Sequence, residues 1–216
     1  YALLKHSLTK GQREITMFLL KEDLKLNPHF DNILGFNKDE TPLHIAIEKN
    51  DMKIIQKLLD KKANVNIDDE NYNTPLHIAV LDKDMEMVQI FLDKGNIDLR
   101  SHENYIHIAV NNKHKEMVQL LLEKGAQVNC YDRNKKTPFY FAVKNNDMEM
   151  VQILLDNGAD INSRNTEKDT PQSPHWYTCL GIAPGNDIKG MMPIHVAIEN
   201  GYLELVEYLL KHGALV

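Results

Sequence analysis

A hexapeptide that recurs at a nearly constant interval constrains this chain more than any other feature. Residues 41–46 read TPLHIA, and the same six letters return at 74–79. Looser copies read NYIHIA at 104–109, TPFYFA at 137–142 and MPIHVA at 192–197. The intervals between successive starts are therefore 33, 30, 33 and 55 residues. A period near 33 residues indicates that one supersecondary unit is repeated along the chain and that the fold is a stack of such units.

Two further elements recur in register with the hexapeptide. A second apolar block follows each copy, at 54–59, 87–92, 117–122, 150–155 and 205–210. Three of these blocks lead into a Gly-Ala pair, at 125–126, 158–159 and 213–214. With three elements in register, the chain resembles the ankyrin-repeat family over nearly its full length.

This resemblance implies an all-α fold, a solenoid of about six helix-turn-helix repeats joined by β-turn or finger loops. Residues 1–216 would then form a single domain of stacked repeats, not two compact ones. The expected repeats span about 1–33, 37–69, 70–102, 103–132, 133–165 and 166–216, and the last carries an inserted loop at 169–191. The first repeat is recognisable only by its apolar residues, because it lacks both the Thr-Pro start and the Gly-Ala end.

Elementary helix chemistry explains why these residues recur. Thr-Pro suits a helix start, since the Thr hydroxyl can accept a hydrogen bond from a free backbone N–H and Pro fits the first turn. A small alanine at 46, 79, 109, 142 and 197 predicts close packing of this helix against its neighbours. Asp51, Asp84 and Asp147 are expected to cap the second helix. Glycine at 95, 125, 158 and 213 is expected to end that helix in a left-handed conformation.

Composition and charge fit an interaction module. The 216 residues are 43% hydrophobic and 26% charged, within the normal globular range. No apolar run approaches the roughly 18 residues that a membrane-spanning helix needs. The net charge of −6, with no basic stripe, argues against nucleic acid as a partner. Cys130 and Cys179 are the only cysteines, so no disulfide framework is expected and a cytoplasmic location is predicted.

Four of the ten histidines have a structural explanation. They share one motif position, where the family uses the ring to hydrogen-bond between neighbouring loops: His44, His77, His107 and His195. Because stacked helices lie about 10 Å apart, these rings are too distant to share one metal ion. The pair His175 and Cys179 makes a weak case for zinc, since structural zinc sites use four ligands.

No catalytic or cofactor motif survives inspection. The chain has no Gly-x-Ser-x-Gly, no His-Glu-x-x-His, no phosphate-binding glycine loop and no four-ligand Cys/His set. Met87, Met117 and Met150 share one motif position, which predicts core packing and not a promiscuous groove. We therefore expect a non-enzymatic chain that has no catalytic residues, no cofactor and no metal site.

The positions that packing leaves free predict a surface that binds another protein. In the ankyrin family, finger loops and first helices line a concave groove where partners bind. Carried over to this sequence, the finger positions are Lys38, Glu40, Glu70, Asn71, Asn73, Glu103, Arg133, Asn134 and Lys136. The first-helix positions are Glu48, Lys49, Leu81, Asp82, Asn111, Asn112, Lys144, Asn145, Glu199 and Asn200. These residues vary between repeats while the packing positions do not, as expected of a recognition surface on a regular scaffold.

The inserted loop adds two aromatic candidates, Trp176 and Tyr177. Packing does not require the extra residues, since the flanking repeats keep their core positions without them. Aromatic anchors dominate binding energy at interfaces, so contact with a partner is one interpretation. Folding back over the last repeat, or disorder, are the others that stay open.

Two alternatives to a simple binding module also stay open. The chain begins at Tyr1 without Met and stops within a motif at 213–216, which predicts a fragment of a longer protein. It would then be the targeting or regulatory domain of a larger enzyme, toxin or host-directed effector, acting in the host cytosol if it is delivered there. The number of repeats alone suggests a third function, cytoplasmic inhibition of a transcription factor.

Overall fold

A computed structural model describes residues 2–21, 41–69, 71–95, 97, 99, 105–164 and 191–215. Within these ranges the regular structure is entirely helical, and twelve helices form six pairs, so the predicted all-α helix-pair fold is confirmed. Two compact units are distinguished, Tyr1–Asp98 and Leu99–Val216, and each is described by itself. The single domain expected over 1–216 stays a prediction.

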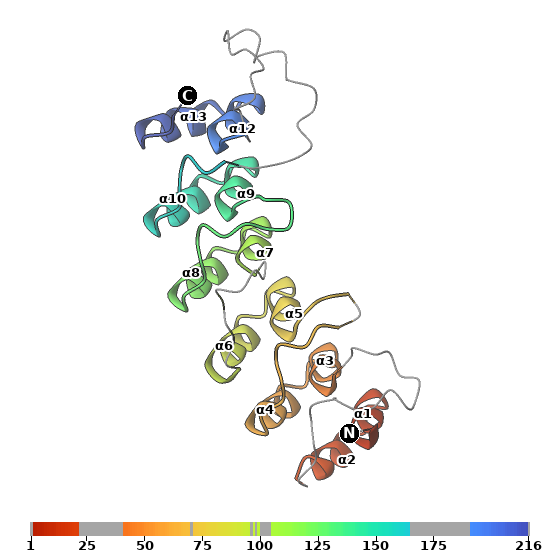
Figure 1. Ribbon diagram of the computed structural model, residues 1–216. Helices are drawn as coiled ribbons and strands as arrows, with labels where there is room; N and C mark the ends of the chain where they lie inside the picture. Colours follow the sequence, from red (N-terminus) through yellow and green to blue (C-terminus); the bar gives the residue numbers. More distant parts are fainter. Residues whose placement is uncertain are drawn as a thin grey trace. The chain divides into compact units, whose positions relative to one another are not determined.

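The first unit contains three helix pairs (Figure 1). They are α1 (Ala2–Thr9) with α2 (Arg13–Leu19), α3 (Pro42–Glu48) with α4 (Met52–Asp60), and α5 (Pro75–Leu81) with α6 (Met85–Lys94). Helix α3 contacts both α1 and α5, and α4 contacts α6. First helices therefore pack in one layer and second helices in another, and the core lies between the layers.

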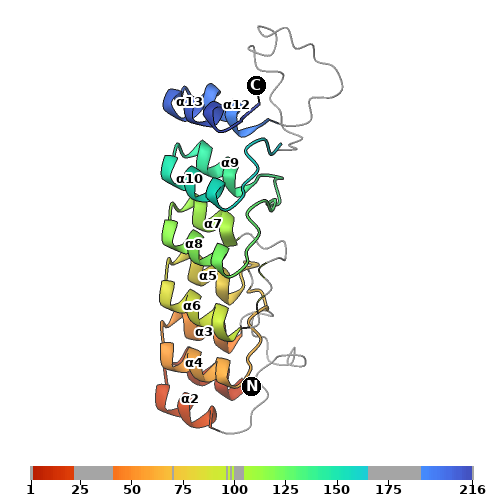
Figure 2. The same ribbon diagram turned by 90° about the vertical axis from the view of Figure 1, so that its left-hand side faces the viewer.

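The second unit repeats this arrangement. Its pairs are α7 (Tyr105–Asn111) with α8 (Lys115–Glu123), α9 (Pro138–Lys144) with α10 (Met148–Asp156), and α12 (Pro193–Glu199) with α13 (Leu203–Lys211). Helix α9 contacts both α7 and α12, and α10 contacts α8. Figure 2 shows the connection from α8 to α9 projecting beyond the ends of the helices, so the loop between pairs lies at one edge of the layers.

The first helices begin as the Thr-Pro motif predicts. Thr41 caps α3, Thr74 caps α5 and Thr137 caps α9, and each is followed by Pro at the start of the helix. The hydroxyl of Thr74 accepts a hydrogen bond from the backbone N–H of His77 at 3.3 Å. In return, Nδ1 of His77 accepts from the backbone N–H of Thr74 at 3.1 Å, which completes a capping box.

The second helices begin with a side-chain cap in four of the six pairs. Asp51, Asp84 and Asp147 each accept a hydrogen bond from the backbone N–H three residues on, as predicted. Helix α8 has His114 at this position, and its Nδ1 accepts from the backbone N–H of Met117 at 3.2 Å. Sequence inspection missed this cap because histidine is not a usual N-cap residue.

The repeated small and sulfur-containing positions lie in the core. The five alanines of the hexapeptide are fully buried: Ala46, Ala79, Ala109, Ala142 and Ala197. Met87, Met117 and Met150 are buried as well, which confirms core packing. The first pair packs less completely, because Leu3, Ile15 and Phe18 are exposed while Leu4 and Leu8 are buried.

The prediction for the helix ends is right at three glycines and wrong at the fourth. Gly125, Gly158 and Gly213 have positive φ values of 95°, 83° and 93°. Gly95 has a φ of −87°, so it needs no left-handed conformation. A Cβ there would meet the carbonyl oxygen of Phe91 at 2.4 Å, so glycine is required for a close backbone approach. Glycine is therefore needed at position 95, but for space and not for a left-handed conformation.

One face of the last helix pair differs from the equivalent faces before it. Val110 on α7 and Val143 on α9 are buried, because the first helix of the next pair covers each of them. Ile198 on α12 occupies the same repeat position and is 46% exposed.

Among the described helices, none is long and apolar enough to cross a membrane. The inserted loop lies outside the described residues, except for Met191.

Candidate functional site

Short finger loops precede the first helices, and an aspartate shapes each of the two that are described. In the finger at 69–73, Oδ1 of Asp69 accepts hydrogen bonds from the backbone N–H groups of Asn71 and Asn73, both at 2.8 Å. In the finger at 132–136, Oδ1 of Asp132 accepts from the N–H groups two and four residues on, at 2.9 and 2.7 Å. Such side-chain turns hold a loop without help from a sheet.

A histidine ties each finger to the helix pair before it. Nε2 of His44 lies 3.2 Å from the carbonyl oxygen of Asn73, and Nε2 of His107 lies 3.0 Å from that of Lys136. Nδ1 of His44 accepts from the Thr41 N–H, so Nε2 carries the hydrogen and donates it to the carbonyl. Burial lowers the pKa of both histidines, which favours this neutral form. The predicted bridging role is thus confirmed at His44 and His107.

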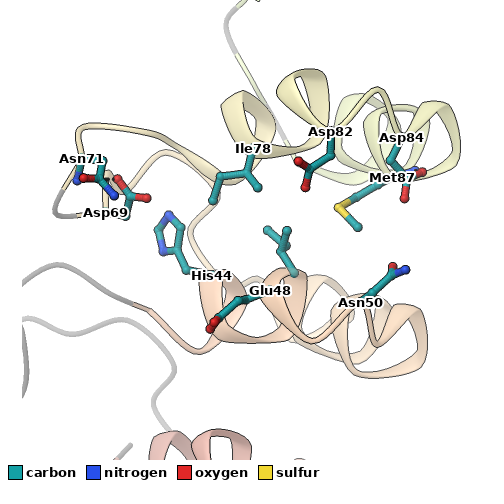
Figure 3. Close-up of a pocket in the computed structure, with 10 residues that line it drawn as sticks. His44, Glu48, Asn50, Asp69, Asn71, Ile78, Asp82, Asp84 and Met87 are labelled. Carbon is teal, nitrogen blue, oxygen red and sulfur yellow. Dashed lines mark hydrogen bonds between the residues drawn. The ribbon is translucent and has the colours of Figure 1, made fainter.

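The first unit contains a groove between α3 and α5, which we call the α3–α5 groove (Figure 3). Its volume is about 660 Å³. The residues that line it are His44, Ile47, Glu48, Asn50, Asp69, Asn71, Ile78, Asp82, Asp84 and Met87. Three partner-binding residues predicted from the sequence meet here, namely Glu48, Asn71 and Asp82.

The groove has an apolar floor and a polar rim. Ile47 and Met87 are buried and Ile78 is half-buried, so their side chains form the floor. Figure 3 shows Asp82 and Met87 pointing toward α3, while the carboxylate of Glu48 points away from α5 at the opposite edge. A surface of this kind excludes water at its centre and offers polar contacts at its margin, which is the usual anatomy of a protein interface.

The four carboxylates of the groove are not equivalent. The carboxylates of Asp69 and Asp84 already form hydrogen bonds within the fold. Asp69 accepts backbone hydrogen bonds that shape the finger, and Asp84 accepts one that caps α6. The side chains of Asp82 and Glu48 are exposed and form no hydrogen bond or ion pair within the part of the chain that the structure describes. Local structure therefore does not explain why these two positions are acidic.

The structure separates some residues that the sequence grouped together. Lys49 follows Glu48 but lines a smaller hollow of about 170 Å³ between the first two helix pairs. In that hollow, Arg13 forms an ion pair with Asp51, with Nε and Oδ2 2.6 Å apart. Leu81 is 46% exposed and lines neither hollow. Asn73 belongs to the finger and is half-buried.

The predicted residues of the second unit lie on its finger and its first helices. Arg133, Asn134, Lys144, Asn111, Glu199 and Asn200 are exposed, whereas Asn112, Lys136 and Asn145 are half-buried. Nζ of Lys136 lies 5.0 Å from the centre of the Tyr140 ring, within range of a cation–π contact. This finger is basic, because it holds Arg133, Lys135 and Lys136 beside a single aspartate.

Six predicted site residues lie outside the described residues, so the structure does not place them: Lys38, Glu40, Glu70, Glu103, Trp176 and Tyr177. The same holds for His175 and Cys179. Sequence reasoning also missed one candidate, Tyr72 at the tip of the first finger, which is 70% exposed and has a positive φ of 62°. A large aromatic residue between two asparagines in a loop was the signal that could have found it.

Two other observations bear on the chemistry of the site. Among the described residues, no group of three or more His, Cys, Asp or Glu side chains is arranged to hold a metal ion. Burial raises the pKa of the Cys130 thiol to about 11, so this cysteine stays protonated at neutral pH and is a poor nucleophile.

Comparisons with known proteins connect this geometry to a family. A model of three ankyrin repeats matches residues 4–102 and 84–165, and a single-repeat model matches 189–216. Repeats of this kind are typically non-catalytic and generally mediate protein interaction. No curated protein matches the chain significantly.

Solved structures agree with the family models. The ankyrin repeat domain of Bcl-3, described as a unique member of the IkappaB protein family, is 25% identical with a TM-score of 0.75; the match covers 99% of this chain and 86% of that one. An ankyrin repeat domain from Acinetobacter baumannii AYE is 20% identical with a TM-score of 0.75, covering 98% of both chains. The ankyrin repeat protein EF0377 is 21% identical with a TM-score of 0.72, covering 97% and 96%. The chain belongs to the ankyrin-repeat family.

Proposed function

We propose that this chain is a non-enzymatic module that binds a partner protein through its finger loops and first helices. The observation that carries the proposal is the α3–α5 groove, which gathers Glu48, Asn71 and Asp82 around an apolar floor. The side chains of Glu48 and Asp82 are exposed and form no hydrogen bond or ion pair among the residues that the structure describes. The inserted loop, with Trp176 and Tyr177, is part of the proposed surface. A cytosolic location belongs to the same proposal.

The test is a triple substitution in the groove, Glu48→Ala, Asn71→Ala and Asp82→Ala. We expect binding of a partner identified by affinity capture and mass spectrometry to weaken about tenfold or more. A tenfold loss corresponds to about 1.4 kcal/mol, which truncation of one well-buried interface residue among the three would supply. Helical circular dichroism and the melting temperature should change little, since the three side chains are exposed.

A matched control variant removes the same number of charges at positions of the first unit outside the groove. Gln56→Ala, Glu86→Ala and Asp93→Ala remove one amide and two carboxylates from exposed positions on the second helices. This control variant should bind the partner like the original chain. Equal binding by the groove variant would contradict the proposal. The two alternatives, a targeting domain of a larger protein and a transcription-factor inhibitor, stay predictions.

A further inference from the structure

We propose that the α3–α5 groove binds a segment of the partner in which a lysine or arginine lies beside an aliphatic side chain. This inference rests on the proposed function and names the chemistry of the partner at one groove. It follows from the combination of charge and apolar surface in the groove, and from how little of that charge the fold itself uses.

The first argument is charge. The described residues that line the groove include the acidic side chains Glu48, Asp69, Asp82 and Asp84, and none of these described residues is Lys or Arg. The histidine among them, His44, is held in the neutral form by burial, which lowers its pKa, and its Nδ1 accepts the Thr41 N–H. No basic group among the described lining residues therefore offsets these carboxylates, and a cationic segment would meet complementary charge there.

The second argument is the apolar floor. Ile47, Ile78 and Met87 form it. Figure 3 shows the carboxylate of Asp82 beside this floor, directed toward α3. Lysine and arginine combine a long apolar stem with a charged head, so the stem can cover apolar surface while the head reaches the rim. An aliphatic neighbour would fill the rest of the floor. A small cation such as sodium would leave this floor uncovered, and an acidic segment would be repelled.

The third argument is that this charge is local and not general. The finger of the second unit carries Arg133, Lys135 and Lys136, so the equivalent region of another repeat has the opposite sign. The exposed ring of Tyr72, next to Asn71 in the chain, adds a face on which a cation can stack. A uniform excess of acid over the whole chain would not produce this contrast between repeats.

The experiment selects ligands without assuming the partner. A displayed library of random peptides is panned on the full chain, and the selected peptides are synthesised. The peptides are about 12 residues long, enough to cross one groove. Their affinities are measured for the original chain, for Glu48→Gln with Asp82→Asn, and for the control Glu86→Gln with Asp93→Asn. Both pairs remove two charges with little change of shape, and the groove pair breaks no hydrogen bond among the described residues.

We expect the selected peptides to be enriched in Lys or Arg next to Ile, Leu or Val. Their affinity should fall about five- to tenfold in the groove pair, stay unchanged in the control pair, and weaken as salt is raised. One outcome would overturn this inference and leave the proposed function standing. In that outcome the selected peptides lack basic residues and bind the groove pair and the control pair equally, but they no longer bind the variant with alanine at Glu48, Asn71 and Asp82. Peptides bound equally by all variants would overturn both.

Discussion

The imidazole of His44 connects two neighbouring repeats through opposite edges of one ring. Nδ1 accepts from the Thr41 N–H at the start of its own helix, and Nε2 donates to the Asn73 carbonyl of the next finger. The finger also contributes Asp69 and Asn71 to the α3–α5 groove, so this ring holds part of the candidate site in place. A protonated ring would carry hydrogen on both nitrogens and would lose the bond to Thr41.

The protonation of His44 therefore gives a prediction about pH. Burial lowers its folded-state pKa below the ordinary 6.5, so the unfolded chain takes up the proton first as the pH falls. The stabilisation from neutral His44 is full above about pH 6.5 and is lost as the pH falls toward the lowered value. Chemical denaturation at about pH 7.5 and about pH 5.5 should show a smaller free energy of unfolding at the lower pH.

The variant His44→Gln tests the assignment. Glutamine can keep the capping box and does not titrate, so the difference in unfolding free energy between the two pH values should shrink. At neutral pH the variant should lose about 1 kcal/mol with the bond to Asn73. His6→Gln, at an exposed histidine of the same unit, is the control. An undiminished pH difference in His44→Gln would assign the effect to other groups.

Among the structural elements, the four second helices with a side-chain cap share one design with a single departure. Asp51, Asp84 and Asp147 cap α4, α6 and α10, whereas His114 caps α8. The ring of His114 accepts the same backbone hydrogen bond but at 3.2 Å, and it lies 3.5 Å from Glu116. A neutral imidazole is a weaker partner for the positive end of a helix than a carboxylate is.

Replacing His114 by aspartate should stabilise the chain. We expect a gain of about 0.5–1 kcal/mol, seen as a rise of about 1–4 °C in the melting temperature. Glu116 would then lie near a second carboxylate, but Asp84 with Glu86 and Asp147 with Glu149 show the same spacing in other repeats. The reverse change, Asp147→His, is the matched control and should lower the melting temperature. Two variants that melt alike would show that the cap contributes little.

The helix starts were predictable because their causes are local in sequence. Thr, Pro and the residue three positions on form a capping box without help from distant segments. The left-handed residue in the turn inside each pair was not predicted. Gly11 and Gly201 hold this position in the first and last repeats, but Lys83 and Lys113 have positive φ values of 59° and 54° at the same position. Lysine is not a typical left-handed residue, so the residue type gives no signal in those two repeats.

The site was predictable only in part, because its geometry depends on contacts between repeats. The sequence indicated that Glu48 and Lys49 belong to one surface, yet they line different hollows. Adjacent residues at a helix end point in different directions, and the relative rotation of two helices decides which hollow each reaches. The acidic groove likewise needs Asp69 of the finger and the turn with Asp82 and Asp84 to meet beside α3, which their sequence spacing does not reveal.

For the molecule as a whole, stability is a sum of helix pairs and the interfaces between neighbours. Within each unit, helices contact their own partner and the adjacent pairs. A pair with one neighbour and no side-chain cap is therefore held less firmly than a pair with two neighbours. In the first unit, α1 and α2 form the weakly held pair, since Gln12 makes no capping hydrogen bond and the pair packs against α3. Helices α3 and α4 form the firmly held pair, because they have a neighbouring pair on each side.

Amide hydrogen exchange should reveal this gradient. We expect backbone amides of α1 and α2 to exchange at least about tenfold faster than those of α3 and α4, because local opening of a weakly held pair costs less than opening of the core. In the second unit, α9 and α10 should be the slowest. Mass spectrometry of peptides after timed labelling provides the measurement, and equal protection of all the helix pairs would contradict the nearest-neighbour description.

The exposed Ile198 on α12 has a consequence for engineering. Val110 and Val143 show that a first helix of the same kind covers this position elsewhere in the unit. The face around Ile198 is therefore a ready-made acceptor for a copied cassette, for example residues 132–164 joined in register behind α13. Length becomes an adjustable property, and each added block lengthens the row of positions at which new specificities can be built.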